Sequence, residues 1–115
     1  MKDSIREEIF NNYVAEFKEL GYDVYSPCSK SPGFYYAYVT DGIHIIYFQI
    51  SYWGGLEWST CCIPSRETGT GTRIDFEFDG KESVERAFEI KFGNPFSNFE
   101  HFAKHEEKFC KLKKL

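Results

Sequence analysis

The chain has 115 residues, 42% of them hydrophobic and 19% aromatic, with a formal net charge of −4. This length and apolar content suffice for one folded domain spanning residues 1–115, and they exclude an intrinsically disordered chain. The acidic balance disfavours general affinity for nucleic acid. No apolar run approaches the roughly 20 residues of a membrane span, and the first residues are charged, unlike those of a signal peptide. The cysteines lack the spacing of a disulfide framework, so we expect a cytoplasmic protein with reduced thiols at Cys28, Cys61, Cys62 and Cys110.

The first predicted element is a helix over residues 4–20. Ser4 and Glu7 have the spacing of a capping box, in which each side chain bonds the other residue's backbone N–H. Gly21 follows as a stop signal. The apolar side of this helix, which we expect to face a core, consists of Ile5, Ile9, Phe10, Tyr13, Val14, Phe17 and Leu20.

Strand-like sequence then fills most of the chain as far as residue 78. Asp41-Gly42 predicts a two-residue type I′ hairpin turn. The two strands that flank this turn are apolar on both faces, which indicates a central sheet position, or a second layer or partner against the far face. The expected strands cover residues 22–25, 34–40, 43–52, 56–63 and 73–78.

Two short helices are predicted after the strands. One covers residues 83–92, and the other covers 97–111 with Ser97 and Glu100 as a second capping box. The order of elements predicts an α+β fold. We expect an antiparallel meander of about four or five strands, with the N-terminal helix and the two C-terminal helices packed on one face.

The connection from residue 63 to residue 73 is too long for a simple hairpin. Glycine allows close backbone approach and arginine binds anions bidentately, so this loop could bind a phosphate, a nucleotide or nucleic acid. It lacks the Gly-Lys-Ser/Thr ending and the following helix of a phosphate loop. The alternatives are a self-bonded surface connection and a loop that presents residues to a protein partner. The candidate binding residues are Arg66, Thr68, Gly69, Thr70, Gly71 and Arg73.

An acidic stretch follows this loop. Asp75, Glu77 and Asp79 alternate with apolar residues, which predicts a strand with one wet face. Such a face commonly keeps an edge strand soluble. It is also suited to act as an acidic docking surface for a basic protein groove that normally holds nucleic acid. Aromatic residues gather on the central strands and include Trp53 in a predicted turn, and they either fill the core or anchor a protein interface.

Sequence patterns for catalysis are weak. His101 and His105 share one helix face at a spacing that zinc ligands use, but the helical wheel directs both toward solvent. Cys61 or Cys62 could act as a nucleophile with His44 or His101 as base, although adjacent strand residues point to opposite faces. We therefore expect no catalytic residue and no cofactor, and a zinc-dependent enzyme using His101 and His105 is kept as an alternative.

The run from Pro64 to Gly71 resembles a Pro-x-x-x-Thr-Gly-Thr-Gly segment of small plasmid- and prophage-encoded proteins, most of them uncharacterised. This chain has Thr72-Arg73 where an aromatic residue often follows the last glycine of that segment. The resemblance covers part of the chain and implies a mobile-element origin, but it transfers no catalytic residue.

These features together predict a small, non-enzymatic module that binds a protein partner. The resemblance extends this to a mobile-element inhibitor of a host defence complex or a nucleic-acid-handling complex. Direct nucleic-acid binding is less favoured, a membrane partner is not expected, and a homo-oligomer is left open.

Overall fold

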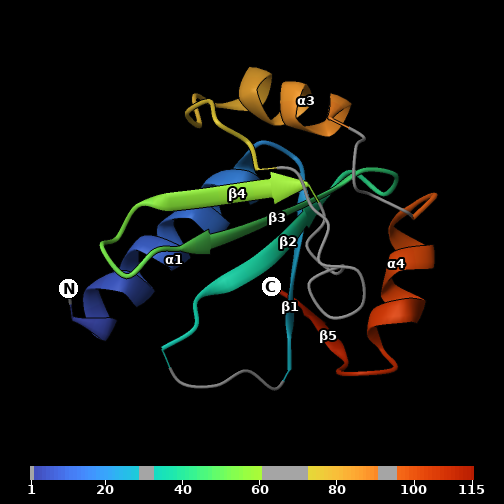
Figure 1. The fold of residues 1–115 in the computed structure, drawn as a ribbon, viewed down its shortest axis with the longest axis horizontal. Coiled ribbons are helices and arrows are strands. Elements are labelled where there is room, and N and C mark those ends of the chain that lie inside the picture. Colours follow the sequence, from blue (N-terminus) through green and yellow to red (C-terminus); the bar gives the residue numbers. More distant parts are fainter. Residues whose placement is uncertain (1, 29–32, 61–72, 91–95) are drawn as a thin grey trace.

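The computed structural model describes residues 2–28, 33–60, 73–90 and 96–115, and the statements below refer to these residues. It contains an N-terminal helix, a five-stranded antiparallel sheet and two later helices, which confirms the predicted α+β class (Figure 1). None of its helices combines the length and the apolar character that crossing a bilayer requires in this part of the chain. The elements are α1 (Asp3–Glu19), β1 (Asp23–Pro27), β2 (Tyr36–Thr40), β3 (Ile45–Ile50), β4 (Leu56–Thr60), α3 (Lys81–Glu89), α4 (Phe99–Glu106) and β5 (Leu112–Lys114).

The strands lie in the order β4-β3-β2-β1-β5. The first four form the expected meander, and every neighbouring pair is antiparallel. β5 was not predicted, because its three residues follow the predicted helix over 97–111 and carry no strand pattern of their own. It pairs with β1, so the C-terminal end of the chain forms one edge of the sheet and β4 forms the other.

One face of the sheet carries the larger core. Phe48 lies between two rings of α1, with centroids 5.5 Å from Phe10 and 5.1 Å from Phe17. Val84 and Phe88 of α3 belong to the same buried cluster. The predicted inward face is confirmed for α3 and for Phe10, Val14 and Phe17 of α1, whereas Ile5, which was predicted to lie on that face, is 45% exposed. Both helices cover the same face of the sheet, as expected.

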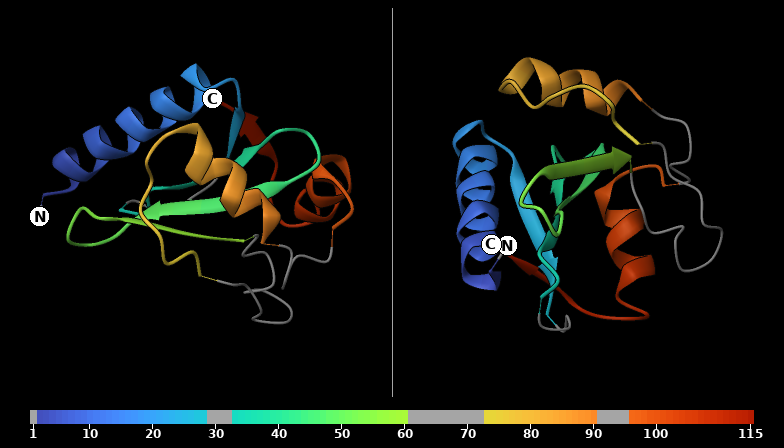
Figure 2. Two further views of the ribbon diagram at one scale, coloured as in Figure 1. Left: turned by 90° about the horizontal axis from the view of Figure 1, so that it is seen from above. Right: turned by 60° about the vertical axis from the view of Figure 1, so that its left-hand side comes forward.

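The opposite face of the sheet is covered by α4. The ring of Phe102 lies 4.8 Å from that of Tyr38, and the ring of Phe99 lies 4.4 Å from that of Tyr25. Figure 2 shows α1 and α4 on opposite sides of the sheet. The expectation that all helices share one face therefore holds for α1 and α3, while α4 uses the second apolar surface. This surface explains why the central strands are apolar on both faces.

Arg6 is a buried cation on the inward side of α1, with 8% of its surface exposed. Its guanidinium donates to the backbone carbonyls of Gly33 at 2.9 Å, Ile50 at 3.0 Å and Ser51 at 3.1 Å. Its charge also lies 5.1 Å from the centre of the Tyr35 ring. One side chain thus ties α1 to the end of β3 and to the chain entering β2, and it satisfies three carbonyls in that region.

The predicted capping boxes are wrong in both helices. α1 begins at Asp3 after Lys2, and no side chain caps it. In α4 the cap is Asn98, whose side chain accepts the His101 N–H at 2.8 Å. Asn98 has the extended backbone of an N-cap residue, and asparagine caps a helix as well as serine does. The capping hydrogen bond therefore comes from Asn98, one residue after the predicted cap, Ser97.

The turn between β2 and β3 also differs from the prediction. Among the described residues only glycines have positive φ, so Asp41-Gly42 is not a type I′ turn. Instead the Asp41 carboxylate accepts the backbone N–H groups of Ile43 at 2.8 Å and His44 at 2.7 Å. The side chain therefore closes a longer connection, in the way that aspartate does in Asx turns.

Candidate functional site

The segment after Arg73 leaves the edge of the sheet instead of continuing it. Arg73 forms an isolated antiparallel β-bridge with Ser59, and the Ile74 N–H donates to the Trp58 carbonyl at 2.9 Å. Residues 74–78 form no strand. The predicted strand over residues 73–78 is thus wrong. The predicted alternation of inward apolar side chains with exposed acidic ones is right. Ile74 is buried, and Phe76 packs against the core.

Aromatic packing explains this departure. The ring of Phe78 lies 4.9 Å from Phe17 of α1 and 5.8 Å from Trp58. The ring of Phe76 lies 5.5 Å from Trp58, and the indole N–H of Trp58 donates to the Phe76 carbonyl at 3.0 Å. The segment forms no ladder along β4, and its two half-buried phenylalanine rings instead pack against Trp58 and, for Phe78, also against Phe17.

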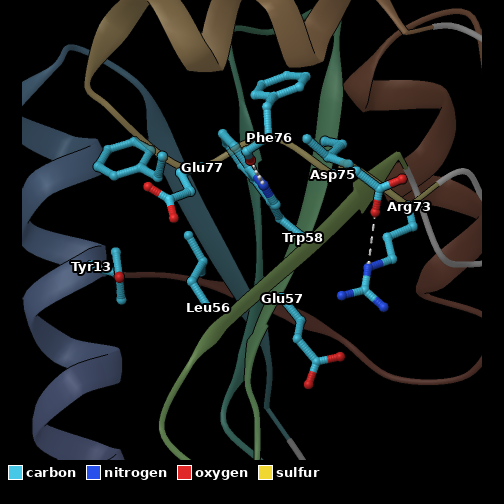
Figure 3. Close-up of a pocket in the computed structure, with 10 residues that line it drawn as sticks. Tyr13, Leu56, Glu57, Trp58, Arg73, Asp75, Phe76 and Glu77 are labelled. Carbon is cyan, nitrogen blue, oxygen red and sulfur yellow. Dashed lines mark hydrogen bonds and ion pairs between the residues drawn. The ribbon is translucent and has the colours of Figure 1, made fainter.

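A groove remains where the segment and β4 diverge. It has a volume of about 380 Å³ and is lined from β4 by Leu56, Glu57 and Trp58 and from α1 by Tyr13. Residues 73–78 form its other wall. Figure 3 shows Tyr13 and Leu56 toward one end of this groove and Arg73 toward the other. We call it the β4 groove.

Acidic groups outnumber basic ones in the β4 groove. Glu57, Asp75 and Glu77 contribute carboxylates, and Arg73 contributes the one cation among the described lining residues. Arg73 Nε lies 3.2 Å from Asp75 Oδ1, and both side chains are exposed (Figure 3). Because this cation is shared with a carboxylate, the described lining of the groove carries a net negative charge.

Tyr13 lies at the α1 end of the groove. Partial burial raises the pKa of its hydroxyl above the ordinary value, and the nearby Glu16 carboxylate raises it further. Burial and negative charge at this end act in the same direction, so the Tyr13 hydroxyl stays a neutral hydrogen-bonding group beside the groove.

A second polar arrangement is formed by Asp41 and His44. Asp41 Oδ2 lies 2.9 Å from His44 Nδ1, and the His44 ring stacks on Phe88 with centroids 5.3 Å apart. Partial burial raises the pKa of Asp41, but hydrogen bonds from the His44 ring and from the backbone N–H groups of His44 and Ile43, together with the charge of His44, bring it below its usual value. The pair shapes the turn after β2.

The structure brings some of the predicted binding residues together and separates others. Arg73, Asp75 and Glu77 line the β4 groove, whereas Asp79 lies 3.8 Å from Arg86 of α3 and does not line it. Trp53 is 79% exposed in the turn before β4. The predicted residues that lie outside the described part of the chain are Arg66, Thr68, Gly69, Thr70 and Gly71.

The two histidines of α4 are engaged with neighbours. His101 Nδ1 accepts the Ser97 N–H at 3.2 Å, and the rings of His101 and His105 lie 5.1 Å and 5.2 Å from that of Phe96. His101 is exposed, as predicted, but His105 is half-buried. No group of three metal-ligating side chains occurs among the residues that the structure describes, and Cys61 and Cys62 lie outside them.

Several residues that the structure makes prominent were not predicted from the sequence. Glu57 and Trp58 lie inside a predicted strand, and the neighbouring sequence does not indicate that a groove forms beside them. Arg6 and Glu106 have a detectable signal, since each lies four residues from an inward-facing phenylalanine, Phe10 or Phe102. Glu106 is 1% exposed and accepts the Tyr38 hydroxyl at 3.4 Å.

No protein-family model matches this chain, and neither the curated proteins nor the solved structures contain a significant match to it. The resemblance to plasmid and prophage proteins therefore stays a prediction.

Proposed function

We propose that this protein is a small, non-enzymatic module that binds another protein through the β4 groove. The observation that carries the proposal is the composition of that groove. Among its described lining residues, three carboxylates surround apolar walls and the one arginine is paired with Asp75. Protein interfaces combine an apolar centre with a charged margin in this way. Trp53, exposed in the turn next to β4, adds an aromatic anchor close by.

The charge of the β4 groove makes a protein a better partner than nucleic acid. Phosphate groups would meet Glu57, Asp75 and Glu77, and the whole chain carries a net charge of −4. A basic protein surface would instead gain favourable electrostatic interactions and a faster association rate.

The biological setting that we propose follows from the resemblance of residues 64–71. A mobile element would encode the protein as an inhibitor that acts stoichiometrically in the host cytoplasm. Its target would be a defence complex or a nucleic-acid-handling complex, whose basic surface the acidic groove would occupy in place of nucleic acid.

Two alternatives gain less support. Binding of phosphate or a nucleotide by the loop at residues 64–73 would use Arg73, whose side chain is held by Asp75 in acidic surroundings. A zinc enzyme would use His101 and His105, which both pack against Phe96. No feature of the described residues favours either alternative over protein binding.

A pull-down from host lysate tests the proposal. Tagged wild-type protein should retain a partner at modest salt, and the variant Asp75→Asn/Glu77→Gln should retain much less of it. The control Glu8→Gln/Glu19→Gln removes the same charge from exposed positions of α1 and should behave as the wild type. Failure of the wild type to retain any partner, from hosts with and without mobile elements, would refute the proposed function.

A further inference from the structure

The outer edge of β4 has backbone groups available for pairing. The Trp58 carbonyl accepts the Ile74 N–H, so Trp58 directs its backbone groups away from β3. Alternate residues of an antiparallel ladder share one direction, so the N–H and carbonyl of Leu56 also point outward. Among the described residues, Ile74 supplies the one backbone bond to this edge between Leu56 and Trp58. The N–H groups of Leu56 and Trp58 and the Leu56 carbonyl can therefore receive an added strand.

The opposite edge of the sheet is built to resist pairing. β5 has three residues, of which Lys113 and Lys114 are exposed. A short strand that carries lysine is a common means of preventing one sheet from pairing with another. β4 has five residues and contains neither lysine nor proline. The two edges thus differ in the features that decide whether a further strand can bind.

The charges beside β4 select the kind of strand. A residue directly opposite Glu57 on an added strand would have its Cβ about 5 Å away, where a cation is favoured and a carboxylate is disfavoured. Asp75 and Glu77 add negative charge across the groove. A second copy of β4 would bring another Glu57 and another acidic groove, so charge opposes pairing between two copies of this chain.

We propose that the edge of β4 binds an extended, basic segment of a partner protein as an added antiparallel strand. Lysine or arginine side chains of that segment lie toward Glu57, and the intervening side chains lie toward Leu56 and Trp58 on the apolar side. This inference rests on the proposed protein-binding function and specifies the chemistry of the partner and the way in which it binds. Strand addition obtains affinity from main-chain hydrogen bonds and specificity from alternate side chains.

The first test uses the full chain labelled with ¹⁵N and a peptide of about seven residues that alternates lysine with valine, long enough to pair with β4 from Leu56 to Trp58. We expect saturable binding that weakens as salt is raised, and amide exchange at Leu56 and Trp58 that slows by about tenfold or more. The same peptide with glutamate in place of lysine should not bind.

A second peptide separates strand addition from simple charge attraction. N-methylation at alternate residues removes the N–H groups that would bond β4 and keeps every lysine. This peptide should lose binding, and its use leaves the fold of the protein untouched. In the protein, Glu57→Lys should weaken the unmethylated peptide by about fivefold, since repulsion replaces attraction. Glu107→Lys, at an exposed position after α4, should leave binding unchanged.

Equal binding of the methylated peptide, or protection confined to other amides, would overturn the proposal. Slowed exchange at Leu56 and Trp58 that grows with protein concentration and needs no peptide would also overturn it, because a second copy would then occupy the edge. If a lysate partner is retained equally by wild type and Glu57→Lys while the peptide does not bind, strand addition fails and the protein-binding function stands. If the wild type retains no partner, the function itself fails.

Discussion

The indole N–H of Trp58 and the carbonyl of Phe76 are joined by a 3.0 Å hydrogen bond that crosses from β4 to the segment leaving it. The same indole ring packs against Phe76 and Phe78. One tryptophan therefore holds the far wall of the β4 groove in place, through a directional bond and through apolar contact.

Replacing this tryptophan tests how the wall is held. Trp58→Phe keeps an aromatic ring but removes the donor to Phe76, and it should lower the free energy of unfolding by about 1–3 kcal/mol. Exchange of the Ile74 amide should quicken more than that of Val39 in the sheet centre. Urea denaturation and amide exchange measure the two effects. Unchanged exchange at Ile74 would show that the bond does not anchor the segment.

Arg6 is expected to be among the most sensitive positions of α1. Arg6→Met keeps much of the apolar stem and leaves the carbonyls of Gly33, Ile50 and Ser51 without their shared donor. The free energy of unfolding should fall by about 2–4 kcal/mol. Lys18→Met, at an exposed position of the same helix, should change it by less than about 0.5 kcal/mol. Similar values for both variants, measured by urea denaturation, would contradict a structural role for Arg6.

The packing of α4 on the second face of the sheet can be checked with two phenylalanines. Phe102 is fully buried against Tyr38, whereas Phe109 is 51% exposed. Phe102→Ala should lower the free energy of unfolding by about 3–5 kcal/mol, because it removes a buried ring and leaves a cavity. Phe109→Ala should cost about 1 kcal/mol or less. Thermal and urea denaturation of the two variants would refute the placement of α4 if their order were reversed.

Asp41 should make stability depend on pH in the acid range. Its folded pKa lies below the ordinary value of about 3.9, so its contribution is present above that value and is lost as pH falls through the folded pKa. Wild type should exceed Asp41→Asn in free energy of unfolding by about 0.5–1 kcal/mol near neutral pH. The difference should shrink toward zero at acid pH, where the wild-type carboxyl is also neutral.

The matched control for Asp41 is Glu89→Gln, at an exposed position of α3. It makes the same change from carboxyl to amide and should show a smaller difference from wild type across the pH range. A difference for Asp41→Asn that grew as pH fell would reverse the expected sign and contradict the pairing of Asp41 with His44 and Ile43.

The alternation of Ile74, Phe76 and Phe78 with acidic residues shows what local sequence can reveal. It predicts correctly which side chains avoid water, because any extended backbone turns successive side chains to opposite sides. It does not predict whether the segment pairs with β4. That depends on aromatic contacts with Trp58 and Phe17, which are far away in the sequence.

Arg6 and Glu106 show a second limit. Both occupy inward positions of amphipathic helices, so a periodicity that counts only apolar residues passes over them. Whether a charged side chain can be buried at such a position depends on partners elsewhere in the chain. Here these partners are three carbonyls for Arg6 and the Tyr38 hydroxyl for Glu106.

Local periodicity and turn residues sufficed to predict the α+β class, the approximate positions of α1, α3, α4 and the first four strands, and many of their inward apolar residues. Contacts between distant segments placed α4 on the second face and β5 at one edge. They also turned residues 74–78 away from β4 beside an acidic groove, so that among the described residues Ile74 makes the one backbone bond to the outer edge between Leu56 and Trp58. These features depend on which distant surfaces bury one another, and no local pattern contains that information.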